Sequence, residues 1–388
     1  MENIEEKACL CALNRIFGFE PKIGLALINH LGSAREVFRL STKDLDLLTG
    51  PYFKYKGQIC MEAVKREAEE LAALERKSIT FCGYTEGDYP ALLKECEDAP
   101  IGIYIRSSTP TRDLWKPTEK IGIVGTRDIT SYGSEWCEKV VHSLGITTSK
   151  PLIISGLALG TDIKAHTAAL ENGLPTIGVM ATGPEAVYPS RHIKTAEVMA
   201  STPGCALITD YPPGTAPLAI HFLRRNRIIA GLSNAVILIE SKLKGGGMTT
   251  CRLAYSYNRE VYALPGRIDD LRSQGCNSLI RQKIAEPIAS TDTLMEALGM
   301  KAYRRRRPES FKDLLTSTFG NSSDSASQKK MLLLLNTINK ERGITIEEAG
   351  VKCGMSYKDA SKLLGLLEIE GFICIDLLQR CSINWKNA

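Results

Sequence analysis

The sequence predicts an α/β protein built on a parallel, doubly wound sheet. Strand–loop–helix alternation between residues 120 and 290 carries this prediction, because parallel strands need crossover helices that cover both faces of the sheet. Residues 235–239 are apolar at every position, which is typical of a strand covered on both faces. Six apolar, β-rich runs supply the expected strands: Ile121–Val124, Leu152–Ser155, Thr176–Met180, Ala206–Thr209, Ala235–Glu240 and Val261–Leu264.

Length and composition indicate a globular protein of several domains. The 388 residues suffice for two to four domains of about 100–200 residues each. Hydrophobic residues make up 44% of the chain and charged residues 24%, which excludes a disordered or fibrous protein. The formal net charge is only +5, so a nucleic-acid site would have to concentrate positive charge in one place.

Features of membrane proteins and zinc proteins are missing from the sequence. No apolar run approaches the roughly 18–20 residues that cross a bilayer. The segment Met1–Lys7 is acidic and does not resemble a signal peptide. We therefore expect a cytoplasmic protein with no membrane partner. The twelve cysteines include no CxxC pair and the five histidines no HExxH motif, so we expect reduced cysteines and no metal site.

The chain up to residue 328 divides into a helical segment, the core that contains the expected strands, and a linker. Residues 1–77 carry apolar residues at helical spacing, and we expect a helical domain of SAM-like or helix-hairpin-helix type. Such a domain could bind DNA, although packing or partner contact is the commoner role. The core is expected at 78–300. Residues 301–328, with the basic run Arg304–Arg307 and a polar low-complexity stretch, are interpreted as a linker.

The C-terminal segment 329–388 has the element order of a winged helix-turn-helix domain. We expect three helices, at Lys329–Arg342, Thr345–Cys353 and Tyr357–Glu370, because Gly343, Ser356 and Gly371 provide the stop and cap signals. A strand-like run at Phe372–Ile375 follows.

Glycine-containing loops after three of the expected strands are candidate phosphate sites. Ligands of open α/β sheets bind beyond the carboxyl ends of the strands, where helix N-termini offer unpaired N–H groups. Neither GxxxxGK[ST] nor GxGxxG occurs, so we expect no Walker-type ATPase, no dinucleotide dehydrogenase and no cofactor. The candidate residues are Gly125, Thr126, Arg127 and Ser131 in the first loop, Ser155 and Gly156 in the second, and Lys244, Gly246, Gly247 and Thr249 in the third.

A basic segment beside an aromatic residue is the most unusual feature of the chain. Phe222 is followed by Arg224, Arg225, Asn226 and Arg227. A charge run is usually a solvated helix face. Arginines on phosphates with an aromatic ring for base stacking are, however, how single-stranded nucleic acid is held without reading its sequence. On a helix, Arg224 and Arg227 share a face, while Arg225 lies about 100° round from Arg224.

Catalytic patterns are weaker than this basic segment. His166 lies four residues after Asp162, which is the spacing of a base and the group that orients it. The alternative is a capping Asp162 and a packed His166. No GxSxG motif is present to anchor a hydrolase triad.

Five groups of motifs follow one another in order along about residues 79–290. They are Gly125-Thr126-Arg127 with Ser131-Tyr132-Gly133, the run Ser155–Asp162 with Ala165-His166, Tyr188-Pro189, Phe222 with Arg225–Ser233, and Leu264-Pro265-Gly266 with Gly275–Ile280. In this order the motifs resemble those of the DprA/Smf family, bacterial DNA-processing proteins of natural transformation and recombination.

This resemblance implies an extended Rossmann-like core that binds single-stranded DNA in a positively charged pocket. It implies a homodimer formed through the core, protection of single strands and loading of the RecA recombinase onto them, without catalytic turnover. The implied roles are phosphate contact by Arg127 and the Gly156 loop, base stacking by Phe222, backbone and pocket-wall contacts by Arg225, Asn226 and Arg227, and close approach of the strand at glycines 245–247.

Three positions depart from the family pattern. Relatives often carry a lysine at the position of Ala219, and commonly read FPxRNR where this chain has Leu223 in place of the proline. The glycine-rich motif usually reads close to SGSLITA and here begins at Lys244. We expect Arg224 and Lys244 to compensate in charge, so the departures affect affinity more than function.

Two other functions remain as alternatives. The core is similar, more distantly, to the nucleoside-monophosphate phosphoribohydrolases, whose PGGxGTxxE motif contains a catalytic glutamate. Alignment on Gly245-Gly246 places Arg252 at that glutamate, which disfavours an enzyme. A transcription factor that reads DNA with the helix Ser356–Glu370 is disfavoured because that helix carries two lysines against three acidic residues.

Overall fold

The computed structural model describes residues 2–300, 311–319, 325–341 and 343–384, and divides the chain into two compact units. The first unit comprises Met1–Ala302 and the second Tyr303–Ala388. Of the predicted linker 301–328, the basic run Arg304–Arg307 lies outside the described residues. The prediction is wrong for residues 311–319, which form a helix whose Leu315 packs into the core of the second unit, and for residues 325–328, which begin the next helix.

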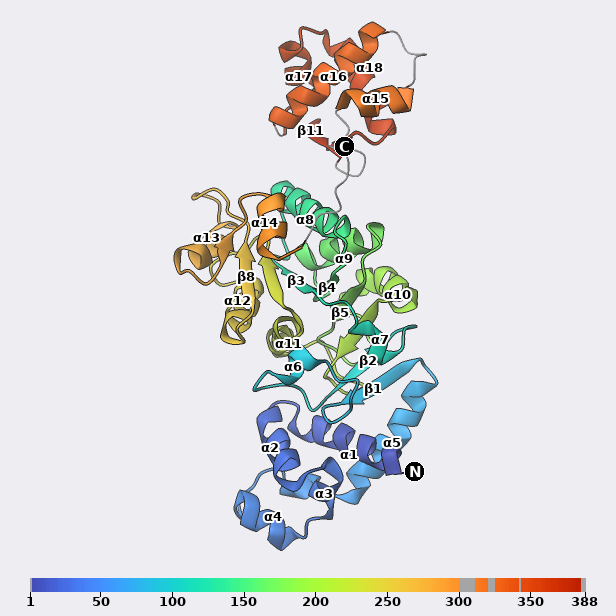
Figure 1. The fold of residues 1–388 in the computed structure, drawn as a ribbon, viewed down its shortest axis with the longest axis vertical. Coiled ribbons are helices and arrows are strands. Elements are labelled where there is room, and N and C mark those ends of the chain that lie inside the picture. The colour runs from blue at the N-terminus through green and yellow to red at the C-terminus, as the bar shows by residue number, and fades with distance from the viewer. Residues whose placement is uncertain (1, 301–310, 320–324, 342, 385–388) are drawn as a thin grey trace. The chain divides into compact units, whose positions relative to one another are not determined.

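A nine-stranded sheet forms the centre of the first unit, in the order β1-β2-β6-β5-β4-β3-β7-β8-β9 (Figure 1). The strands from β3 to β9 pair in parallel, whereas β1 pairs with β2 and β2 with β6 in antiparallel fashion. The six expected runs are confirmed as β3 to β8. The strands are β1 (Ile79–Gly83), β2 (Gly102–Arg106), β3 (Lys120–Val124), β4 (Leu152–Ser155), β5 (Thr176–Val179), β6 (Ala206–Thr209), β7 (Ala235–Leu238), β8 (Glu260–Ala263) and β9 (Glu286–Pro287).

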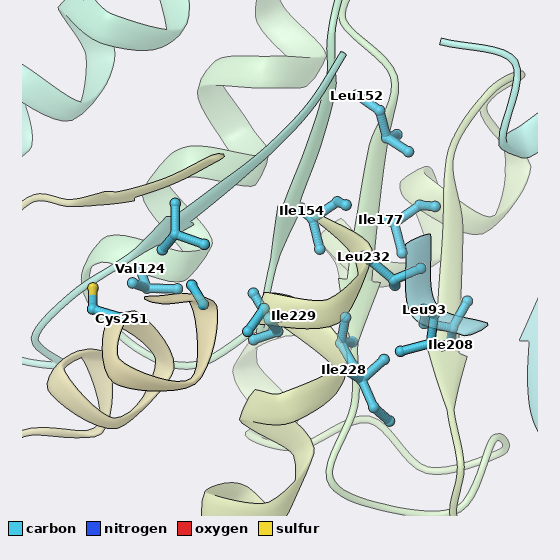
Figure 2. Packing of buried hydrophobic residues seen from close by; sticks show 14 of the residues in the cluster. Leu93, Val124, Leu152, Ile154, Ile177, Ile208, Ile228, Ile229, Leu232 and Cys251 are labelled. Carbon is cyan, nitrogen blue, oxygen red and sulfur yellow. The ribbon is translucent and has the colours of Figure 1, made fainter. Parts of the chain in front are cut away.

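Helices cover both faces of this sheet, as expected for a Rossmann-like arrangement. One face packs against α6, α11, α12 and α13, and the other against α8, α9 and α14. Figure 2 shows Ile228, Ile229 and Leu232 of α11 against strand residues such as Ile154 and Ile177. The helices are α6 (Ala91–Lys94), α7 (Thr111–Leu114), α8 (Ser131–Gly145), α9 (Thr161–Glu171), η2 (Ser190–His192), α10 (Ile193–Ser201), α11 (Ala219–Leu232), α12 (Gly246–Ser256), α13 (Gln274–Arg281) and α14 (Thr291–Ala297).

The direction of winding reverses between β3 and β7. From β3 the chain adds β4, β5 and β6 on one side, and then returns to add β7, β8 and β9 on the other. Open α/β sheets bind their ligands beyond the carboxyl ends of the strands at such a switch point. The loops after β3, β4 and β7 are therefore the place to look for a site.

The N-terminal helices belong to the same compact unit as the sheet. Their hydrophobic core includes Ile79, Phe81 and Tyr104 of β1 and β2, so the expected boundary at residue 77 does not separate two compact units. The assignment of this segment to a SAM-like domain stays a prediction. The elements are α1 (Glu2–Phe17), α2 (Pro21–Leu31), α3 (Ala34–Arg39), α4 (Thr42–Thr49), η1 (Lys56–Gln58) and α5 (Met61–Glu75).

The second unit contains four helices and a two-stranded antiparallel sheet among its described residues. The three expected helices are present within a few residues of their expected bounds, and the expected strand pairs with a second one that was not predicted. Assignment to the winged-helix class stays a prediction. The elements are α15 (Phe311–Phe319), α16 (Ser325–Lys340), α17 (Ile346–Lys352), α18 (Tyr357–Ile369), β10 (Ile373–Ile375) and β11 (Cys381–Ile383).

Candidate nucleic-acid interface

A pocket of about 690 Å³ opens at the switch point of the sheet. The loops after β3, β4 and β7, one face of α11 and the first turns of α12 line it. It contains nine of the fourteen candidate residues: Gly125, Thr126, Arg127, Phe222, Arg225, Asn226, Lys244, Gly246 and Gly247.

An exposed Arg127 and a half-buried Phe222 lie together in this pocket. The Arg127 guanidinium lies 5.2 Å from the centre of the Phe222 ring. It makes no ion pair within the part of the chain that the structure describes, so its N–H groups are available to a ligand. Tyr188 packs edge-on against Phe222, with ring centres 5.5 Å apart, and is 49% exposed. The pocket therefore presents an aromatic surface beside an accessible positive charge.

The loop that carries Arg127 is fixed by the start of α9. The backbone N–H of Thr161 donates to the carbonyl oxygen of Thr126 at 3.1 Å, and the Thr161 hydroxyl donates to the same oxygen at 3.3 Å. Gly160 precedes Thr161 with φ of +74°, and a Cβ there would collide with the Thr126 and Arg127 backbone. Only glycine accommodates this approach of two loops without strain.

Arg225 lines the pocket but is 4% exposed. Its guanidinium donates to the backbone carbonyls of Gly156 and Val179, and so joins α11 to the loop after β4 and to the end of β5. Burial lowers the pKa of Arg225 from its usual value. The expected contact of Arg225 with the DNA backbone is thus replaced here by contacts with the protein's own backbone. Asn226 also bonds the protein's own backbone: its side-chain amide donates to the Gly246 carbonyl at 3.3 Å and so joins α11 to the start of α12.

Arg224 and Arg227 do not line this pocket, so Arg227 does not have the pocket-wall position that the family resemblance implies. Arg227 is 6% exposed, pairs with Asp210, and donates to the Asp98 carbonyl. Arg224 donates to the Gly18 carbonyl at 2.7 Å. The reason is helical geometry: residues 224 and 227 share a face of α11 that points away from the face carrying residue 225.

The remaining candidates support the pocket from outside its lining. Ser155 is buried and donates to the Ile123 carbonyl at 2.6 Å, so its hydroxyl is committed to the sheet. Gly156 accepts the bond from Arg225, and a Cβ on Gly156 would meet that guanidinium. Ser131 and Thr249 lie in the first turns of α8 and α12 without lining the pocket.

Lys242, Tyr188 and Thr250 line the pocket but were not among the candidates. Tyr188 belongs to a motif that supported the family resemblance, although the sequence reasoning gave it no role. Lys242 is exposed two residues before Lys244, and its position in the loop that follows β7 is the signal that could have found it.

Two acidic residues offset part of the positive charge of the pocket. Asp128 pairs with Arg272, whose Nε lies 3.1 Å from the Asp128 carboxylate. Burial raises the pKa of Asp162, and Asp162 accepts a bond from the Ala158 N–H at 3.3 Å. Four basic lining residues face these two acids: Arg127, Arg225, Lys242 and Lys244.

Asp162 and His166 do not form a base–orienter pair. His166 Nδ1 bonds the Thr176 hydroxyl at 2.8 Å in the interior of the sheet, and burial lowers the pKa of His166 to about 3. Among the described residues, no group of three or more His, Cys, Asp or Glu side chains could hold a metal ion.

Known proteins match this architecture in sequence and in structure. A family model described as DNA recombination-mediator protein A matches residues 80–299. The chain is 38% identical over 208 residues to DNA processing protein DprA of Streptococcus pneumoniae, which covers 54% of this chain and 71% of that protein.

Two solved structures share the fold. The X-ray structure of DNA processing protein A from Streptococcus pneumoniae gives a TM-score of 0.54 at 29% identity, covering 67% of this chain and 92% of that one. A structure of DNA processing protein A from Helicobacter pylori, described for its single-stranded DNA binding mode, gives a TM-score of 0.50 at 28% identity and covers 57% of this chain and 95% of that one. The chain therefore belongs to the DprA/Smf family, the family of DNA recombination-mediator protein A.

Proposed function

We propose that the switch-point pocket binds single-stranded DNA without reading its sequence. The observation that carries this proposal is the accessible Arg127 guanidinium beside Phe222, with Lys242 and Lys244 on a neighbouring loop. Phosphates pair with the basic groups, and a base stacks on the aromatic surface, which is available to any base because every base has a π-face. In a duplex the faces of each base are covered by stacking on the neighbouring base pairs, so double-stranded DNA binds more weakly.

Family membership extends the proposal beyond the pocket. The Helicobacter pylori relative, described for single-stranded DNA binding, supports the choice of ligand. We propose that this chain protects single strands in the cytoplasm, acts as a homodimer and loads the RecA recombinase during transformation and recombination. No helix of the described residues has the length and apolar character to span a bilayer. The N-terminal SAM-like and C-terminal winged-helix domains have partner or dimer contacts in this proposal.

In this proposal the protein binds DNA and catalyses no reaction. Arg252 stands where phosphoribohydrolases carry their catalytic glutamate, and its guanidinium donates to the Gln282 side chain at 3.1 Å on the protein surface. Incubation with AMP is therefore expected to release no adenine. Release that an active-site substitution abolishes would establish the enzyme instead.

The main test compares single- and double-stranded oligonucleotides of one length at fixed salt. We expect tighter binding of the single strand. Arg127→Ala should weaken it and lower the salt slope of binding by about 0.7, the contribution of one phosphate contact. Arg112→Ala is the matched control, because Arg112 is an exposed arginine outside the pocket. Equal affinity for both DNA forms, or equal effects of the two substitutions, would count against the pocket.

A further inference from the structure

A second pocket lies on the other side of α11 from the first. Its volume is about 540 Å³. The turn between α1 and α2 forms one wall, and α11 and α12 form the other. Of the fourteen candidate residues for the proposed function, Arg227 alone lines this second pocket.

Leu223 lines both pockets and forms the ridge between them. Its side chain is 50% exposed. On a helix, successive residues are turned by about 100°. Phe222 therefore faces the first pocket and Arg224 the second, while Leu223 stands between. A strand that leaves the first pocket across Leu223 enters the second directly.

The second pocket repeats the chemistry of the first. The Arg224 guanidinium lies 4.4 Å from the centre of the Phe19 ring, and His221 is tilted against that ring with centres 5.8 Å apart. In the first pocket, Arg127 likewise lies over the Phe222 ring, and Tyr188 packs edge-on against it. His221, unlike Tyr188, is buried and supports its ring from outside the pocket lining. Phe19 is 52% exposed, so one part of the ring remains open for stacking.

The charges of the second pocket suit a base inside and phosphates at the rim. Arg224 makes no ion pair within 4.0 Å in the described part of the chain, although its charge interacts with Glu20 at longer range, so the guanidinium can also attract a phosphate. Lys22, which lines the pocket, pairs with Glu97, and both side chains are exposed, so the pair is weak and easily exchanged. The carboxylates are engaged by protein groups: Glu20 by Lys54 and Tyr55, and Asp98 by the Tyr257 hydroxyl.

We propose that this second pocket is an additional base-stacking subsite for the single strand that leaves the first pocket, with Phe19 as its platform. The proposal rests on the proposed function of the first pocket. A helix is about 10 Å across with its side chains, so at the roughly 3.4 Å spacing of stacked nucleotides about three nucleotides cross the ridge. The N-terminal helical segment thereby contributes directly to the length of DNA that one chain holds.

The test measures binding of two oligothymidylates, one of about four nucleotides that fills the first pocket alone and one of about twelve that reaches both. Phe19→Ala should weaken binding of the long strand about 5- to 100-fold, the usual effect of losing one stacked base. It should leave the short strand unchanged, and Phe19→Trp should restore the long-strand affinity. Lys22→Ala should lower the long-strand salt slope by up to about 0.7.

Tyr52→Ala is the matched control, because Tyr52 is an exposed aromatic residue of the same helical segment that lines neither pocket. Thermal unfolding of each variant verifies that it is folded. If the wild-type chain binds neither strand, the proposed function itself fails. If Phe222→Ala weakens both strands while Phe19→Ala weakens neither, or weakens both equally, the first pocket stands and the second subsite is overturned.

Discussion

At the scale of single residues, Arg225 joins three elements from inside the core. Substitution by alanine leaves the carbonyl groups of the buried residues Gly156 and Val179 without this donor. Each unsatisfied buried group costs about 1–3 kcal/mol. We expect Arg225→Ala to lower the free energy of unfolding by about 3 kcal/mol or more, measured by urea denaturation.

Arg127→Ala is the contrast for this experiment, since Arg127 is exposed and should change stability by less than about 0.5 kcal/mol. An Arg225→Ala variant with wild-type stability and weak DNA binding would contradict our assignment. That outcome would mean that Arg225 contacts the DNA directly.

His166 is expected to make the free energy of unfolding depend on pH. Its pKa in the folded protein falls from 6.5 to about 3 because the ring is buried. The unfolded chain therefore binds the proton more readily, so this contribution to stability is complete above pH 6.5 and is lost as the pH falls. Between about pH 7.5 and about pH 5.5 the loss attributable to His166 is about 1.4 kcal/mol.

Urea denaturation of the wild type and His166→Asn at both pH values measures this loss. The comparison uses the change with pH, so a constant packing cost of the substitution cancels. We expect the variant to lose about 1.4 kcal/mol less than the wild type over the interval. Parallel pH profiles would show that His166 titrates normally.

Residue types and spacing predicted the site only in part. Arg127 and Phe222 could be placed because each stands close to a strand end or a helix start that faces the switch point. Whether Arg224, Arg225 or Arg227 lines the pocket depends on the rotation of α11 about its axis. That rotation is set by packing of Ile228, Ile229 and Leu232 on the sheet, which a charge pattern does not reveal.

At the scale of elements, parallel strands were predictable and their antiparallel neighbours were not. A strand buried on both faces has a continuous apolar run, and β3 to β8 show it. The residues of β1 and β2 indicate strands but contain nothing that specifies antiparallel pairing with β6, because pairing depends on partners distant in the chain.

The junction between the β3 loop and α9 provides a prediction at this scale. Gly160 and Gly173 both have positive φ, but a Cβ at Gly160 would collide with the backbone of Thr126 and Arg127, whereas a Cβ at Gly173 would meet nothing within 4 Å. We expect Gly173→Ala to cost about 1 kcal/mol from its φ alone. Gly160→Ala should cost at least about 3 kcal/mol.

Urea denaturation measures both costs, and a DNA titration tests their consequence. Gly160→Ala should also weaken binding of single strands because the Arg127 loop must move, while Gly173→Ala leaves binding unchanged. Equal costs for the two substitutions would show that the close approach of the loops is not a constraint.

At the scale of the whole molecule, the division into two compact units assigns the proposed DNA pocket to one of them. Every residue that lines either pocket lies within Met1–Ala302. In the second unit, α18 carries Lys358 and Lys362 against Asp359 and Glu368, which does not favour contact with phosphates. Truncation after Ala302 should therefore keep the affinity for short single strands within about threefold.

A second truncation, after Pro308, separates the basic run from the second unit, because it retains Arg304–Arg307. If that run contacts phosphates, the shorter chain should show a salt slope lower by up to about 3, at roughly 0.7 for each arginine. We expect equal slopes, because the pocket supplies the phosphate contacts. A folded Met1–Ala302 fragment that no longer binds single strands, while the full chain does, would move the DNA site out of the pocket and into the second unit or its connection.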